Sequence, residues 1–305
     1  MSDKPRRSSD VAALQRALGS VAEVWAPEDA EEPILAPATR GAVFEWLAEL
    51  RAEDELRAVG LKPRATALLH GPPGCGKTTL AHHLAARLGV PLVLVGAEKI
   101  FKPYLGESEQ ALDRLFKGLA MAGSPCIAFL DEIEAIGGKR AMNSQGGADN
   151  ARTAVLTVLL RRIEQFDGLL VAATNRPQDL DPALWRRFNL QVAVDLPGDD
   201  ERFAILRRYG LPFDFAERDL DLLCRLTDGA SPALLRGVME GVKRGLVIGG
   251  RLGRDVSDPA AAFARVVASV MPPPEIASPP LWEAGGTREL RGMQWPLRRS
   301  DGEGT

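Results

Sequence analysis

The chain has 305 residues and a formal net charge of −3, with 45% hydrophobic and 26% charged residues. That length and apolar content support two compact units, while the dispersed basic residues form no basic face and argue against nucleic acid as a partner. The 3 widely spaced cysteines fit a reducing compartment better than a disulfide framework. No run approaches the roughly 18 apolar residues of a membrane span, so we expect a cytoplasmic protein without a membrane partner.

Residues 1–32 are charged and rich in Ala, Pro and Glu, and their polar start does not resemble a signal peptide. One short amphipathic stretch, residues 11–18, can form a helix. We expect a flexible N-terminal arm that serves as a tether or docking segment rather than as a domain.

Residues 33–198 alternate β-prone runs with helical patterns. Strands are expected at 67–69, 91–95, 126–130, 169–173 and 192–194, and helices near 38–58, 78–88, 108–121 and 151–165. Two of the β-prone runs are apolar throughout, as strands buried on both faces should be. The alternation predicts an α/β unit, in which a parallel sheet is sandwiched by helices.

Beyond residue 198 the strand patterns stop. Helical patterns near 199–208, 216–227, 232–247 and 258–270 are separated by glycines, which predicts a small all-helical lid domain over residues 199–271. A tail at 272–305 opens with three prolines and contains Trp282 and Trp295. Because a disordered segment rarely keeps two tryptophans, this tail is predicted to be a docking segment.

The most informative segment reads Gly71-Pro72-Pro73-Gly74-Cys75-Gly76-Lys77-Thr78-Thr79. It fits the pattern G-x-x-x-x-G-K-[ST] between a β-prone run and a helical pattern, which predicts a phosphate-binding loop, or P-loop. The glycines let successive amides face a triphosphate, Lys77 supplies charge to the β- and γ-phosphates, and the Thr78 hydroxyl can ligate Mg²⁺. A chance match of a glycine loop is the alternative, and the flanking strand and helix argue against it.

Two further strand ends carry polar side chains. Asp131 and Glu132 follow one buried run, where Asp131 would hold Mg²⁺ through its water shell and Glu132 would polarise the attacking water. Asn175 follows another and is suited to orient that water or touch the γ-phosphate. Because the carboxyl ends of parallel strands point the same way, Lys77, Asp131 and Asn175 are expected to converge at one edge of the sheet.

A short helical stretch ends in the pair Arg186 and Arg187. From the residues alone, this pair is either a solvated basic helix end, which the helix dipole favours, or a functional pair of cations.

In their order along the chain, these motifs resemble those of AAA ATPases, the AAA branch of the AAA+ superfamily, over residues 33–271. The resemblance implies an ATPase core with a helical lid, ATP and Mg²⁺ as cofactors, and a homo-oligomeric ring, usually a hexamer, with ATP between neighbours. It also implies that Asn175 is sensor 1, and that Arg186 and Arg187 are arginine fingers reaching the γ-phosphate of the next subunit.

The segment around Tyr104, Leu105 and Gly106 is similar to pore loop 1 of protein-remodelling AAA members. Tyr104 and Leu105 would grip an extended polypeptide, and Gly106 would let the loop swing. The alternative is a core tyrosine that precedes a helix beginning near Ser108.

Three features depart from the family pattern. Cys75 stands where threonine is commoner, which puts a thiol open to oxidation or alkylation beside the phosphates. In the lid, Leu234 stands where an acidic residue is usual, and no arginine is an obvious sensor 2. Ile34 and Leu35 are expected in the adenine cleft opposite the lid.

Two functions remain open on this evidence. The leading one is an ATP-driven unfoldase or chaperone-like hydrolase that pulls a protein client through a ring pore, which the Tyr104-Leu105-Gly106 loop favours. The alternative is a switch-like ATPase that acts as an assembly or recruitment factor for a protein or nucleic-acid complex without threading. In either case, we expect a partner effector, bound through the N-terminal arm or the C-terminal tail, to select the client and to carry out any proteolysis.

Overall fold

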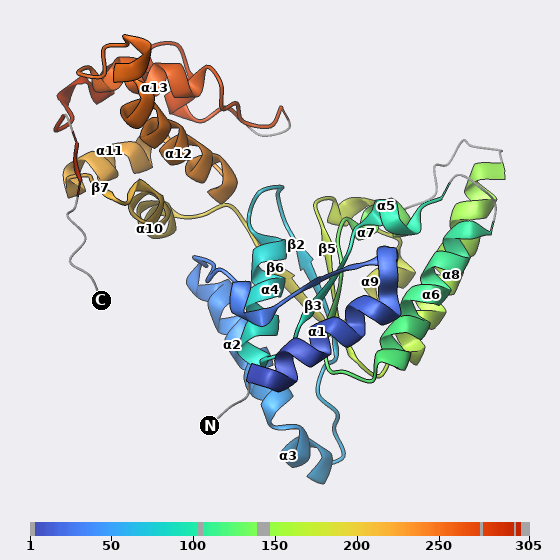
Figure 1. Ribbon diagram of the computed structural model, residues 1–305. Coiled ribbons are helices and arrows are strands. Elements are labelled where there is room, and N and C mark those ends of the chain that lie inside the picture. The colour runs from blue at the N-terminus through green and yellow to red at the C-terminus, as the bar shows by residue number, and fades with distance from the viewer. Residues whose placement is uncertain (1–3, 103–105, 139–146, 275–276, 296, 300–305) are drawn as a thin grey trace. The chain divides into compact units, whose positions relative to one another are not determined.

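The computed structural model in Figure 1 describes residues 4–102, 106–138, 147–274, 277–295 and 297–299. The chain divides into two compact units. Unit 1 comprises residues 1–33, 37–72 and 76–194, and unit 2 comprises residues 34–36, 73–75 and 195–305. Within the described residues, no helix is both long and apolar enough to cross a membrane.

Unit 1 is built on a six-stranded sheet in the order β1-β3-β4-β5-β2-β6. Its strands are β1 (Glu23–Trp25), β2 (Thr66–His70), β3 (Leu92–Val95), β4 (Ile127–Leu130), β5 (Leu169–Thr174) and β6 (Leu190–Ala193). Strands β2 to β6 pair in parallel, as the alternation of β-prone runs and helical patterns predicts. Strand β1 was not predicted, and it pairs antiparallel with β3 at one edge.

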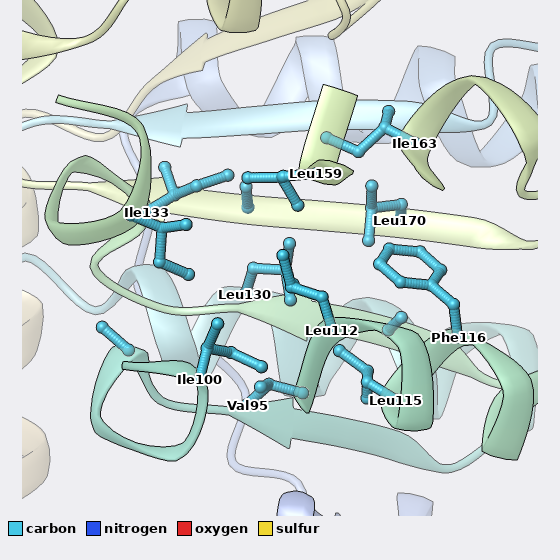
Figure 2. Packing of buried hydrophobic residues seen from close by; sticks show 14 of the residues in the cluster. Val95, Ile100, Leu112, Leu115, Phe116, Leu130, Ile133, Leu159, Ile163 and Leu170 are labelled. Carbon is cyan, nitrogen blue, oxygen red and sulfur yellow. The ribbon is translucent and has the colours of Figure 1, made fainter. Parts of the chain in front are cut away.

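Helices cover both faces of this sheet (Figure 1). They are α2 (Pro37–Arg51), α3 (Glu53–Ala58), α4 (Lys77–Leu88), α5 (Ala97–Ile100), α6 (Glu107–Ala122), α7 (Ile133–Gly137), α8 (Gly147–Gln165) and α9 (Pro182–Trp185). Every residue of β4 is buried, and its alternate side chains Ala128 and Leu130 join the cluster on the α6 and α8 side. Figure 2 shows Leu112 of α6 beside Leu130 of β4, and Leu159 of α8 belongs to the same cluster. Helix α4 packs on β3, β4 and β5.

The N-terminal segment packs on unit 1 instead of standing free as a flexible arm. It forms α1 (Lys4–Leu18), a 3₁₀ turn (Gly19–Val21), β1 and a second 3₁₀ turn (Pro27–Asp29). Leu14 and Leu18, which share a helix face, are buried in the same cluster as α6. Gly118 on α6 permits the close approach, because a Cβ there would lie 2.9 Å from Leu18 Cδ2. The apolar stripe read in the sequence therefore belongs to the core of unit 1.

Unit 2 is mainly helical. It contains α10 (Asp199–Gly210), α11 (Glu217–Leu226), α12 (Pro232–Ile248), a 3₁₀ turn (Gly250–Leu252) and α13 (Pro259–Val267). Ser231 caps α12 by accepting the Leu234 backbone N–H at 3.3 Å, and Leu234 itself is buried in the core. A pair of two-residue strands, β7 (Phe213–Asp214) and β8 (Arg298–Arg299), adds to the predicted all-helical lid.

The described part of the C-terminal tail docks on its own unit. It forms two 3₁₀ segments, Pro280–Trp282 and Gly286–Gly292, and then β8. Leu281 and Leu290 are fully buried in the unit 2 core. Trp282 Nε1 donates to the Val270 carbonyl at 2.7 Å, and Trp295 Nε1 donates to the Val256 carbonyl at 2.5 Å. The two tryptophans that suggested docking are thus engaged within the chain.

Candidate functional site

The P-loop joins β2 to α4, so its strand, turn and helix follow one another as the sequence pattern predicts. Gly71 has a φ of +148°, and a Cβ there would lie 2.2 Å from the Val194 carbonyl oxygen. Gly76 has a φ of +86° and is the N-cap of α4. This backbone leaves the first N–H groups of α4 at the end of the loop, which is an anion-binding arrangement. Cys75 is buried in the same loop.

Lys77 holds its charge inside the loop. The residue is only 6% exposed. Its Nζ donates to the carbonyls of Gly71 and Pro72, each at 2.8 Å. These carbonyls compensate the loss of water around the ammonium group, so a cation is kept within the loop.

Thr78 and Asp131 meet at the end of β4. The Thr78 hydroxyl Oγ1 donates to Asp131 Oδ2 at 3.0 Å. A hydroxyl beside a carboxylate suits a hard cation that keeps several waters and takes its other ligands from phosphates. Within the described residues there is no group of three or more His, Cys, Asp or Glu that could hold a metal ion.

Glu132 follows in an unusual backbone conformation. It is the only described residue other than glycine with a positive φ, at φ 51° and ψ 46°, and it is the N-cap of α7. Its backbone N–H donates to Asp131 Oδ1 at 3.0 Å, which stabilises the turn. The Glu132 residue is exposed, so its carboxylate can reach a water molecule.

Asn175 lies at the end of β5, next to both motif-bearing segments. The Gly71 backbone N–H donates to the Thr174 carbonyl at 3.3 Å. The Asn175 backbone N–H donates to Glu134 Oε1 at 3.2 Å. The end of β5 is therefore tied to the P-loop on one side and to α7 on the other. Sequence reasoning assigned no role to Glu134, although a third acidic residue after Asp131 and Glu132 was a visible signal.

Arg186 and Arg187 follow α9, whose N-terminus is capped by Asp181 through a bond from the Ala183 N–H at 2.7 Å. Arg186 is exposed. Arg187 Nη2 instead pairs with Glu164 Oε1 of α8 at 2.6 Å. The two predicted arginine fingers thus have different environments within the subunit.

Tyr104 and Leu105 lie outside the described residues. Gly106 is described: it has a φ of +84° and is the N-cap of α6, which begins at Glu107. The Lys102 backbone N–H donates to Ser108 Oγ at 3.1 Å and ties the other side of this segment to the helix. Of the residues expected near adenine, Leu35 is buried and Ile34 packs against the unit 2 core.

Residues 67–196 match the family described as "ATPase family associated with various cellular activities (AAA)". Residues 67–196 are an AAA ATPase domain. This match contains the P-loop, Asp131, Glu132, Asn175 and both arginines, and it means that the domain binds a nucleotide.

Several curated AAA relatives are similar to the chain. The proteasome-activating nucleotidase of Thermococcus onnurineus (strain NA1) is 35% identical over 222 residues, which are 68% of this chain and 55% of the relative. The same enzyme of Pyrococcus abyssi (strain GE5 / Orsay) is 34% identical over 258 residues, 77% of this chain and 65% of the relative. The probable 26S proteasome regulatory subunit 10B of Caenorhabditis elegans is 37% identical over 214 residues, 65% of this chain and 52% of the relative. The chain therefore spans between about half and two thirds of the length of these AAA proteins.

Solved AAA structures share the fold. The FIGL-1 AAA domain in complex with ADP aligns with a TM-score of 0.65 at 24% identity, covering 86% of this chain and 90% of that chain. A second FIGL-1 AAA domain structure aligns with a TM-score of 0.67 at 22% identity, covering 90% and 93%. At these identities the likeness establishes the α/β AAA fold.

Proposed function

We propose that this AAA protein is a Mg²⁺-dependent ATPase that works as a homo-oligomeric ring, a hexamer in its usual form, and unfolds or remodels a protein client through the pore. The observation that carries the proposal is the contact of the Thr78 hydroxyl with Asp131 at 3.0 Å, directly beside the exposed Glu132. A site for a divalent cation, at Thr78 and Asp131, is then directly adjacent to a general base, Glu132.

In the proposed reaction each group has a distinct role. The P-loop amides and Lys77 bind the β- and γ-phosphates, and Thr78 and Asp131 would hold a Mg²⁺ ion, which would supply positive charge beside the phosphates. Glu132 accepts the proton of the attacking water, while Asn175 orients that water. Arg186 and Arg187 of one subunit stabilise the transition state on the ATP of its neighbour.

The coupling to a protein client rests on two supports. The relatives with 34–37% identity carry names that refer to proteasome activation or regulation. In this chain, the sequence Tyr104-Leu105-Gly106 comes directly before α6, which is buried against the sheet of the ATPase core. An aromatic side chain can pack on any polypeptide, which suits a client of varied sequence.

The test is to substitute Tyr104 by Ala and by Phe. The readouts are ATPase rate, thermal stability and the unfolding of a fluorescent protein with an unstructured tail. Tyr104→Ala should hydrolyse ATP at a rate within a few-fold of the parent but fail to unfold the reporter. The ATPase cycle continues, but the aromatic side chain that grips the client is missing. Tyr104→Phe should retain most of the unfolding activity, since the aromatic ring of the side chain, rather than its hydroxyl, packs on the client.

The same variants separate the alternatives. A folded Tyr104→Ala protein that hydrolyses ATP and still unfolds the reporter contradicts threading by this loop. If Tyr104 is a core residue instead, the alanine variant should lose roughly 3–5 kcal/mol of stability. A parent protein that hydrolyses ATP without unfolding the reporter would favour the switch-like ATPase.

A further inference from the structure

Among the described residues near the site, Glu134 is the one acidic side chain that forms a hydrogen bond directly with Asn175. It lies on α7, just after Glu132, and its Oε1 accepts the Asn175 backbone N–H at 3.2 Å. Its other oxygen, Oε2, is buried and has no hydrogen-bond partner within the described part of the chain. A buried carboxylate oxygen without a partner costs free energy, so its presence calls for an explanation beyond stability.

The surrounding backbone leaves the end of β5 little freedom. The Thr174 carbonyl accepts the Gly71 N–H at 3.3 Å, and Thr174 Oγ1 accepts the Arg176 N–H at 3.0 Å. On the other side, the Ala135 N–H donates to the Glu132 carbonyl at 2.9 Å, so Glu132 belongs to the first turn of the helix that carries Glu134. The bond from Asn175 to Glu134 closes this chain of contacts and connects the two polar strand ends.

We infer that Glu134 is a positioning residue for ATP hydrolysis. By holding the backbone N–H of Asn175, Glu134 sets the distance between the Asn175 side chain and the Glu132 carboxylate. The inference rests on the proposed ATPase mechanism, in which both groups act on the same water. Such a water tolerates little displacement: a misplacement of about 1 Å can cost on the order of 100-fold in rate. The partnerless Oε2 keeps the carboxylate able to accept a further donor when the site is filled.

The experiment compares Glu134→Ala, Glu134→Gln, Asn175→Ala and the double variant Glu134→Ala/Asn175→Ala in the full chain. The matched control is Asp179→Ala, because Asp179 is an exposed acidic residue on the turn after Asn175. For each protein we would measure kcat and KM for MgATP, the Kd for ADP and the thermal midpoint.

Glu134→Ala should lower kcat by about 10- to 100-fold with KM and the ADP Kd within a few-fold, since the bond to Asn175 is lost while the phosphate ligands remain. Glu134→Gln should retain most of kcat, because the amide oxygen can still accept the Asn175 N–H. The double variant should be no slower than Asn175→Ala alone, because Glu134 acts through Asn175. Asp179→Ala should match the parent.

Additive losses in the double variant would overturn the inference, as would equal losses of kcat in the Ala and Gln variants. A lower thermal midpoint with unchanged kcat would assign Glu134 a purely structural role. If Asn175→Ala hydrolyses ATP at the parental rate, the proposed role of Asn175 fails and the inference fails with it. If Asn175→Ala is slow but Glu134→Ala is not, only the inference fails.

Discussion

Glu132 combines an exposed carboxylate with a left-handed backbone at φ 51°. For a residue with a Cβ this conformation costs about 1–2 kcal/mol, and the bond from its N–H to Asp131 Oδ1 at 3.0 Å offsets part of that cost. The strain lies where two neighbouring carboxylates need different positions, since Asp131 contacts Thr78 while Glu132 is directed to solvent. We therefore assign different roles to the two acids.

Glu132→Gln should retain nucleotide affinity and lose at least 100-fold in turnover. The general base is removed, whereas Lys77, Thr78 and Asp131 remain in place. Steady-state ATPase assays and titration with a fluorescent ATP analogue check both parts. Turnover at the parental rate would assign the base to another residue, and Glu98→Gln, an exposed acid on α5, is the control for a general charge effect.

Among the elements, α1 shows how an apparently peripheral segment becomes part of the core. Its residue Leu14 is completely buried against unit 1, and β1 continues the sheet beyond β3. His82 of α4 contacts the same segment, with its Nε2 2.7 Å from the Ala26 carbonyl and its ring 5.3 Å from that of Trp25. The N-terminal segment therefore contacts both α6 and the helix that follows the P-loop.

Leu14→Ala should destabilise unit 1 by about 2–5 kcal/mol, because it leaves a cavity between α1 and α6. Gln15→Ala is the matched control, since Gln15 is exposed on the same helix and its replacement should leave stability within about 0.5 kcal/mol. Denaturant unfolding followed by tryptophan fluorescence measures both. Equal stabilities for the two variants would show that α1 acts as a free arm in solution.

At the scale of the whole molecule, the proposed ring makes each subunit depend on its neighbour. Arg186 is exposed and can reach another chain, whereas Arg187 pairs within its own subunit with Glu164 at 2.6 Å. In a ring, the γ-phosphate of the neighbour would compete with Glu164 for Arg187, so ion pairing within the subunit and action on the neighbour are alternative states of one side chain.

Arg186→Ala and Arg187→Ala should each reduce hydrolysis, on the order of 10³-fold if the arginine supplies the full transition-state contribution, with nucleotide affinity largely kept. Mixing either variant with Glu132→Gln should restore part of the activity, because some interfaces then pair an intact Glu132 with intact arginines. Arg251→Ala, which alters an exposed arginine of unit 2, should change nothing. Unchanged hydrolysis in both arginine variants would identify the pair as a basic helix end.

The sequence by itself determined the parallel strands of unit 1, the P-loop and the helices of unit 2. These depend on local signals: the uniformly apolar run of β4, the glycines before Lys77 and the serine cap of α12 are each contained within a few consecutive residues. The same signals predicted that Lys77, Asp131 and Asn175 would lie at one edge, because parallel strands share a direction.

Only the tertiary structure decided where the two ends of the chain belong and which acid holds Asn175. Leu14 and Trp295 had readable chemistry, but the groups that receive them, on α6 and at the Val256 carbonyl, come from distant parts of the sequence. Glu134 and Asn175 are likewise separated by 41 positions. A periodic pattern predicts which side chains will be buried. The partner of a buried group depends on how the elements pack against one another, and this packing cannot be read from the local sequence.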